Sequence, residues 1–234
     1  MQFREQMLKK ALTFSFDDGI TQDIRMIELL NKYGLKSTFN LNSELLGGHR
    51  ILIREGLRIA HYKIAPEDVR YVYEGHEIAS HTLTHPNLTT LDRGQIIHEV
   101  EEDRKRLTEL AGYEVIGMAY PGGGINHDLR VADIVRKNTG IRYSRTIITT
   151  GSFGRQEDLY RFNTTAHCLD WERLMELGRT FADLETEEPA VFSVWGHAYE
   201  MDYDPQNWIR LEAFCEMLSG RKDIFYGTNR EVLL

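Results

Sequence analysis

Two adjacent carboxylates end an apolar, alternating segment near the start of the chain. In "TFSFDDG", Asp17 and Asp18 follow this segment and precede Gly19. An Asp-Gly pair is common in turns, and a second Asp can cap the following helix, so a structural explanation is available. Alternatively, two acids at the end of a strand can divide metal binding and proton transfer between them. The rest of the sequence has to decide between these explanations.

Histidines follow two other segments with strand-like composition. "SHTLTHP" places His81 and His85 four residues apart, and "VWGHAYE" places His197 directly after a β-rich run. In a parallel barrel the C-terminal ends of the strands share one face, where active sites form. Asp18, His81 and His85 are then expected to converge as a carboxylate and two imidazoles, a set that suits a divalent metal with open coordination positions. A lone His-x-x-x-His arises by chance, but three clusters at strand ends favour a common site. Five histidines without such a context are expected to be structural or solvated: His49, His61, His76, His98 and His127.

Short β-rich runs alternate with longer amphipathic segments along the chain. The expected strands are Leu12–Phe16, Ser37–Leu41, Glu77–Ser80, Gly117–Tyr120, Tyr143–Ile148, Phe162–His167 and Val191–Trp195. The expected helices are Thr21–Tyr33, Leu91–Leu110, Asp128–Lys137, Trp171–Leu184 and Pro205–Leu218. This alternation predicts βαβ units and a parallel sheet. The fold class is therefore α/β, with a distorted (β/α)7-type barrel of parallel strands.

Composition sets the limits of this model. The 234 residues contain no repeat or linker and are expected to form one domain, residues 1–234, with an excursion at about residues 43–72 over one barrel face. That excursion either shapes a substrate cleft or is a decorative loop. A formal net charge of −8 argues against nucleic-acid and membrane partners, and no run approaches the roughly 18 apolar residues of a membrane span. The polar start of the chain and its two cysteines, Cys168 and Cys215, favour a cytoplasmic location, although a trimmed chain would look the same.

Five motifs, taken together, resemble those of the NodB-homology polysaccharide deacetylases, carbohydrate esterase family 4. They are "TFSFDDG", "HEIASHTLTHPNL", "GMAYPGGG", "LDW" and "VFSVWGHAYE", in family order from about Ala11 to the C-terminus. The resemblance implies that Asp17 is the catalytic base and that His197 is the catalytic acid. It also implies that Asp18, His81 and His85 bind one divalent metal ion, with zinc as the first candidate and manganese, cobalt, iron or nickel as alternatives.

The chemistry implied by this resemblance is hydrolysis of an acetyl amide. A bound metal lowers the pKa of its water towards roughly 7 and polarises the acetyl carbonyl. Asp17 then takes the proton of the attacking water, and His197 protonates the leaving amine. A backbone N–H near Gly122 is expected to stabilise the oxyanion.

Two later motifs depart from the family pattern. Ala119 stands where the third motif usually carries an arginine, Gly122 stands where it usually carries a tyrosine, and His167 replaces the first aspartate of the fourth motif. Arg145 is our candidate for the missing cation, because the period of two in "IRYSRTII" places it on one face of the next strand. The alternative is that Arg145 points outward to the helices or pairs with a surface acid.

Four further residues are candidates for substrate binding: Tyr120, Gly122, Trp171 and Trp195. The two tryptophans form either an apolar wall for the substrate or part of the core. Glu200 follows His197 closely and either orients it or belongs to an ordinary acidic loop.

The leading prediction is a metal-dependent hydrolase that removes acetyl groups from an N-acetylated sugar or polysaccharide by cleaving a carbon–nitrogen amide bond. The alternatives are a hydrolase of another amide or of an O-acetyl ester on the same scaffold, and a degenerate carbohydrate-binding protein. Retention of the whole Asp-Asp-His-His-His set favours the enzyme. The expected partner is an acetylated saccharide, while the sugar and the oligomeric state stay open.

Overall fold

The computed structural model describes residues 8–234, and a nine-stranded sheet forms its centre. The strands of this sheet are β1 (Lys10–Asp17), β2 (Ser37–Leu41), β5 (Glu77–Ser80), β6 (Gly117–Ala119), β7 (Tyr143–Thr149), β8 (Phe162–Thr164), β9 (Ala166–His167), β10 (Ala190–Gly196) and β11 (Ile224–Tyr226). They are hydrogen-bonded in the order β8-β7-β6-β5-β2-β1-β10-β9, with β11 beside β1, and every pair is parallel. The parallel sheet expected from the sequence is confirmed.

The segment 162–167 nearly closes this sheet into a barrel. Its first part, β8, pairs with β7, whereas its second part, β9, pairs with β10 at the other end of the sheet. Between them, the backbone N–H of Thr165 donates to the carbonyl of Ser193 at 2.8 Å. The strand expected over Phe162–His167 is therefore two short strands that occupy one barrel position. With this position counted once, and with β11 left out because it only pairs with β1 off the main strand order, the barrel has the seven strands of the expected (β/α)7-type fold.

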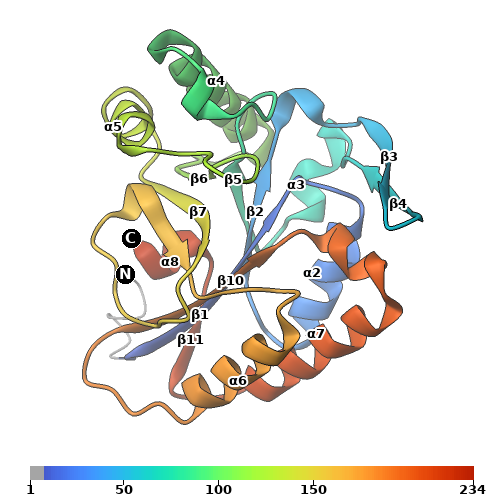
Figure 1. Ribbon diagram of the computed structural model, residues 1–234, viewed down its shortest axis with the longest axis vertical. Helices are drawn as coiled ribbons and strands as arrows, with labels where there is room; N and C mark the ends of the chain where they lie inside the picture. The colour runs from blue at the N-terminus through green and yellow to red at the C-terminus, as the bar shows by residue number, and fades with distance from the viewer. Residues whose placement is uncertain (1–7) are drawn as a thin grey trace.

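Most of the helices lie around the outside of the barrel (Figure 1). The longer ones are α2 (Gln22–Lys32), α4 (Arg93–Ala111), α5 (Leu129–Asn138), α6 (Trp171–Ala182) and α7 (Pro205–Leu218), and all five were expected from the sequence. The shorter ones are α3 (Val69–Val72) and α8 (Asn229–Leu233). Local signals define α4 well, because Asp92 and Gln95 form a capping box at its start and Gly112, with φ of 76°, ends it. Among the described residues, no helix is both long enough and apolar enough to cross a membrane.

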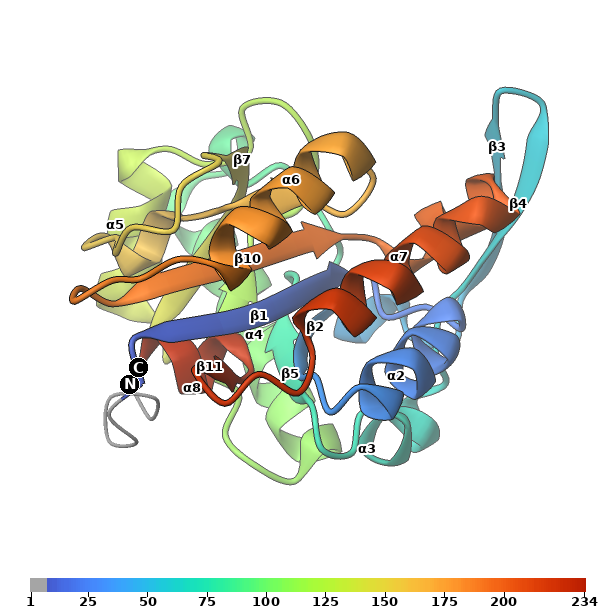
Figure 2. The same ribbon diagram turned by 90° about the horizontal axis from the view of Figure 1, so that it is seen from below.

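The excursion contains an antiparallel hairpin that projects from the barrel (Figure 2). Its strands are β3 (His49–Arg54) and β4 (Leu57–Tyr62), joined by Glu55 and Gly56, which both have positive φ as a two-residue hairpin turn requires. The base of the hairpin returns to the barrel, where the N–H of Ile64 donates to the carbonyl of Gly19 at 2.9 Å. The hairpin is thus anchored directly beside the end of β1.

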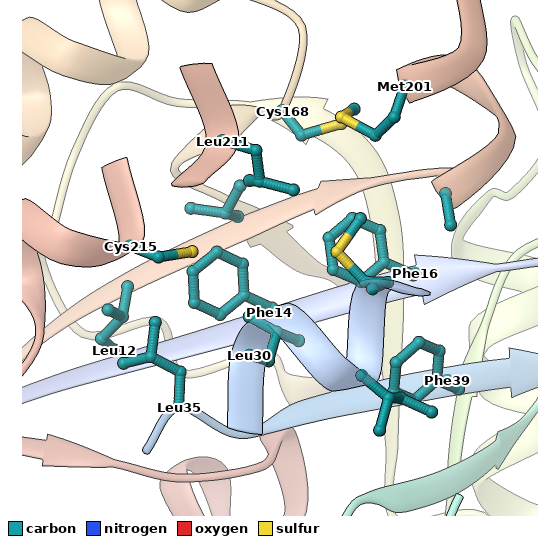
Figure 3. Close-up of a cluster of buried hydrophobic side chains, with 14 of the residues drawn as sticks. Leu12, Phe14, Phe16, Leu30, Leu35, Phe39, Cys168, Met201, Leu211 and Cys215 are labelled. Atoms are coloured by element: carbon teal, nitrogen blue, oxygen red, sulfur yellow. The ribbon is translucent and has the colours of Figure 1, made fainter. Parts of the chain in front are cut away.

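The alternation of β1 separates the apolar core from the polar barrel interior. Phe14 and Phe16 point towards α2 and α7, and the ring of Phe14 meets that of Phe214 edge-on at 6.2 Å (Figure 3). The intervening residues face the barrel interior, where the side chain of Thr13 donates to Asn229 of α8 and that of Ser15 accepts from Asn40. Asp17 is the last residue of this inward-facing set.

Candidate active site

Asp17 lies at the C-terminal end of β1 and is almost fully buried. Its Oδ1 atom forms an ion pair with Arg145 of β7 and accepts a hydrogen bond of 2.8 Å from the side chain of Asn40. Arg145 is fully buried, and its guanidinium lies 4.8 Å from the centre of the Trp195 ring. In the sheet register, Arg145 is the partner of Ala119 on β6. The cation expected from the sequence therefore contacts Asp17, and it comes from β7, the strand next to the β6 strand of Ala119.

The neighbours of Asp17 keep its carboxyl ionised. Burial alone would raise the pKa of Asp17, but the positive charge of Arg145, together with His81 and His197, holds that pKa below its ordinary value. Because Arg145 and Asn40 both bind Oδ1, the second oxygen, Oδ2, is the one left for other contacts. Oδ2 lies 4.0 Å from Nε2 of His81.

Asp18, His81 and His85 form a cluster in which the potential ligand atoms all lie within 4.8 Å of one another. Nε2 of His85 is 4.0 Å from Oδ1 of Asp18. Asp18 and His85 adopt positive φ values of 87° and 63°, in the left-handed region that is uncommon for residues other than glycine. The turn after each strand is thus shaped so that these side chains meet.

The state of His81 makes the cluster a good fit for a divalent metal ion. Nδ1 of His81 lies 2.9 Å from the backbone carbonyl of Ala119. Because a carbonyl only accepts, Nδ1 carries the proton and Nε2 has its lone pair free. Burial lowers the pKa of His81 to about 4, so the ring is neutral at pH 7, as metal binding requires.

The projecting hairpin contributes two side chains that the sequence analysis missed. Nε2 of the buried His61 lies 3.0 Å from Oδ2 of Asp18, and Nδ1 of the same ring accepts from Arg50 at 3.1 Å. Lys63 donates to the backbone carbonyl of Asp18, and its Nζ lies 3.3 Å from Oδ1 of the same residue. Burial alone would raise the pKa of Asp18, but His61 and Lys63 hold it well below its ordinary value. His61 is therefore buried beside the candidate site, a position that the sequence analysis did not anticipate.

His197 follows β10 and lies beside a second group of polar side chains. Its Nδ1 atom is 3.4 Å from Oε2 of Glu200, and Nε2 of His167 approaches the same oxygen at 3.4 Å. Burial alone would lower the pKa of His197, but Glu200 and the carboxylates of Asp18 and Asp17 raise it to about 9. The side chains of His85 and His197 are 34% and 21% exposed, against 2% for Asp17, so solvent reaches the cluster from their side.

The four substrate-binding candidates lie in different surroundings. The Trp195 ring is half-buried between Arg145 and His167, with the His167 ring centre 4.7 Å away. Gly122 lies on an exposed loop after β6 with φ of 82°. The hydroxyl of Tyr120 is used within the scaffold, where it donates to the carbonyl of Tyr160 at 2.8 Å. Trp171 begins α6, and its indole N–H donates to Asn207 of α7 at 3.0 Å.

The fold and this site define a barrel whose strand ends gather two adjacent aspartates with histidines from two further strands. A family model described as polysaccharide deacetylase matches residues 4–143, more than half of the chain. The chain therefore belongs to the polysaccharide deacetylase family, the NodB-homology carbohydrate esterase family 4 that its motifs resemble.

Individual relatives agree with this assignment at low identity. Peptidoglycan-N-acetylmuramic acid deacetylase PdaC of Bacillus subtilis is 27% identical over 125 residues, which cover 52% of this chain and 23% of PdaC. The chain spans about half or less of the other curated relatives that it matches. A family 4 carbohydrate esterase from Streptomyces lividans, solved with acetate, has a TM-score of 0.58 and 16% identity, and the match covers 94% of this chain and 93% of that one. The Puue allantoinase has a TM-score of 0.71 and 14% identity, with 96% and 89% covered. At these identities the two structures show a shared fold only.

Proposed function

We propose that this chain is a metal-dependent hydrolase that removes acetyl groups from an N-acetylated sugar or saccharide. Membership of the polysaccharide deacetylase family supports acetyl removal from a sugar. The observation that carries the finer proposal is the arrangement of an ionised Asp17 beside the Asp18–His81–His85 cluster, with His197 at the same barrel face. Such a set would combine a base, a metal-binding site and an acid at one face of the barrel.

Asp18, His81 and His85 would hold the metal ion, for which one carboxylate and two neutral imidazoles are a suitable donor set. When bound, the ion acts as a Lewis acid that polarises the acetyl carbonyl and makes water a better nucleophile near neutral pH. Zinc is our first candidate, with manganese, cobalt, iron and nickel as alternatives. The hydrogen bonds from His81 to the carbonyl of Ala119 and from His61 to Asp18 hold two of the ligands in orientation.

Asp17 would act as the general base through its free oxygen, Oδ2. Arg145 keeps the carboxyl ionised, and Asn40 prevents it from rotating by holding Oδ1. Asp17 accepts one proton as the oxygen of water adds to the acetyl carbon. A positioned base of this kind typically contributes roughly 10² to 10⁴ in rate.

His197 would act as the general acid. Because Nδ1 faces Glu200, the proton available to the substrate is the one on Nε2. Transfer of this proton to the leaving nitrogen accompanies cleavage of the carbon–nitrogen bond, and the products are acetate and a free amine. We further propose that Trp195 forms the apolar side of the acetyl pocket and that a backbone N–H near Gly122 stabilises the oxyanion, while Tyr120 and Trp171 support the substrate-binding loops from within the scaffold.

The test is acetate release from a panel of N- and O-acetylated mono- and oligosaccharides by the purified chain. The protein is first stripped with a chelator and then reloaded with each metal, with Asp17→Asn as the inactive reference. Release from N-acetyl sugars that disappears on chelation and returns with metal is the expected result. Release from O-acetyl esters alone would redirect the proposal to an esterase. Saccharide binding without any release would point to a binding protein.

A further inference from the structure

Four groups that can donate a hydrogen bond lie around one carboxylate oxygen beside the proposed acid. Oε2 of Glu200 accepts from the backbone N–H of His197 at 2.9 Å and lies 3.4 Å from Nδ1 of the same residue. Nε2 of His167 approaches it at 3.4 Å, and the thiol of Cys168 at 3.8 Å. The Glu200 side chain is only 13% exposed. A carboxylate with these neighbours is either a metal ligand, a structural cap or a partner for the charge on His197.

The hydrogen bonding of His167 argues against a metal ion between these side chains, although His167, His197 and Glu200 are close enough to hold one. Nδ1 of His167 accepts from the backbone N–H of Leu169 at 3.2 Å. A neutral imidazole that accepts at Nδ1 carries its proton on Nε2, the atom that faces Glu200. His167 is therefore a hydrogen-bond donor to the carboxylate, and it has no free lone pair there for a metal.

The charge states of the groups around Glu200 identify His197 as its counter-ion. The thiol of Cys168 is fully buried, and burial raises its pKa well above the ordinary value, so it stays neutral. His167 is the other neighbour, and it needs only its neutral form to donate. The two aspartates near His197 have cations of their own, Arg145 for Asp17 and Lys63 for Asp18.

We propose that Glu200 is a positioning residue that keeps His197 in its imidazolium form and aims its Nε2 proton at the leaving group, with His167 holding the carboxylate in place. This inference rests on the proposed function, in which His197 is the acid. Glu200 thereby supplies the negative charge that the sequence lacks at position 167.

The titration behaviour of this region agrees with the geometry. Burial alone would raise the pKa of Glu200, but His167 and His197 hold it below its ordinary value. The charged and titratable groups that face His197 are Glu200, Asp17, Asp18 and the phenol of Tyr199, whose ring centre is 5.0 Å away. Glu200 is the only one of these four that contacts Nδ1 among the described residues.

The experiment removes the negative charge of Glu200 and keeps its hydrogen bond with the backbone N–H of His197. In Glu200→Gln the amide oxygen still accepts from the backbone N–H of His197, so the turn stays capped while the negative charge is lost. The pKa of His197 is then measured by NMR titration, with the signal assigned from the His197→Gln spectrum. We expect it to fall by about 1–3 units, the usual effect of one adjacent opposite charge. The alkaline limb of the pH–rate profile should move down by the same amount, and kcat should recover towards the wild-type value near pH 6.

A matched control is available at the other end of the barrel. Glu231 accepts from the backbone N–H of Thr228 at 2.8 Å in the same three-residue arrangement, far from His197. Glu231→Gln should leave the His197 titration and the pH–rate profile unchanged.

Three outcomes would overturn the proposal. An unchanged pKa of His197 in Glu200→Gln would reduce Glu200 to a cap of the turn. A kcat that stays low at every pH would indicate a structural defect. If Glu200→Gln bound one zinc ion fewer per chain than the wild type and still kept the ion that depends on His85, Glu200 would be a ligand of a second metal site. The NMR measurement needs no substrate, so failure of the deacetylation assay, which tests the proposed function, can be told apart from failure of this inference.

Discussion

Arg145→Met is the substitution that tests the electrostatic design of the site most directly. Arg145 and Asp17 have side chains that are 0% and 2% exposed, so the remaining carboxylate would be buried without its cation. Breaking a buried pair in this way costs about 3–5 kcal/mol, which corresponds to a fall in Tm of roughly 6–20 °C for a domain of this size. Met fills much of the vacated volume, so the loss of charge is the main perturbation.

The sign of the pH effect follows from the two opposing influences on Asp17. In the wild type its pKa lies below the ordinary value, so the ionised carboxyl contributes stability above the unfolded pKa of about 3.8, and this contribution is lost as the pH falls through the lower folded pKa. Without Arg145, burial dominates and raises the pKa of Asp17 above the ordinary value. The destabilisation by Arg145→Met should therefore shrink on acidification, and the acidic limb of the pH–rate profile should move upward by about 1–3 units.

The assay combines urea unfolding at several pH values with the pH–rate profile for acetate release. Asp17→Asn combined with Arg145→Met should recover stability relative to Arg145→Met alone, because no buried charge is left unpaired. Arg142→Met, an exposed residue just before β7, is the control and should change little. A loss of less than about 1 kcal/mol in Arg145→Met, with an unshifted acidic limb, would refute the reasoning, since a loss that small is typical of an exposed ion pair.

Three further predictions concern separate parts of the molecule. His85→Ala should remove the bound metal, measured by elemental analysis, while the circular dichroism spectrum stays that of the wild type; full metal occupancy would remove His85 from the ligand set. His197→Ala should be nearly inactive on an acetyl amide yet retain much more activity on an activated aryl acetate, whose leaving group needs no proton, and equal losses would count against the acid role. Burial raises the pKa of Asp23 to about 7, so its ionisation should cost stability as the pH rises from about 4 to 7, and Asp23→Asn should make the change in stability between pH 5 and pH 8, measured by urea titration, less unfavourable than in the wild type; an unchanged pH dependence would contradict the assignment.

Local patterns predicted most of the fold because its main elements have local causes. The apolar alternation predicted the strand that leads to Asp17, and the amphipathic periods predicted the five longer helices. The hairpin β3–β4 was missed, since its turn residues, Glu55 and Gly56, are a weaker turn signal than Asn-Gly. The division of residues 162–167 into two strands was not predictable either, because it depends on which strands lie at the two edges of the sheet.

The same distinction holds for the candidate site. Asp18, His81 and His85 stand next to predicted strand ends, so topology alone brings them to one face. His61 of β4 and Lys63, which directly follows β4, reach Asp18 from a segment whose path the sequence does not reveal. Asn40 contacts Asp17 because β2 happens to pair with β1 in that register, which is a tertiary property.

Two of the three departures from the family motifs, those at Ala119 and His167, share one physical interpretation. Ala119 lacks the cation of the third motif, but its register partner Arg145 places a guanidinium against Asp17 from the adjacent strand. His167 lacks the carboxylate of the fourth motif, and Glu200 presents one to His197 from the following turn. In both cases a charge is present where the chemistry would use it, while its position in the sequence has changed.

If the proposed roles are correct, the reaction constrains the location of each charge relative to Asp17 and His197 more tightly than it constrains which strand or turn supplies it. Restoring an arginine at position 119 in the Arg145→Met variant would therefore be expected to restore the ionisation of Asp17, and an acidic limb that stays shifted in that double variant would show that the strand of origin matters after all.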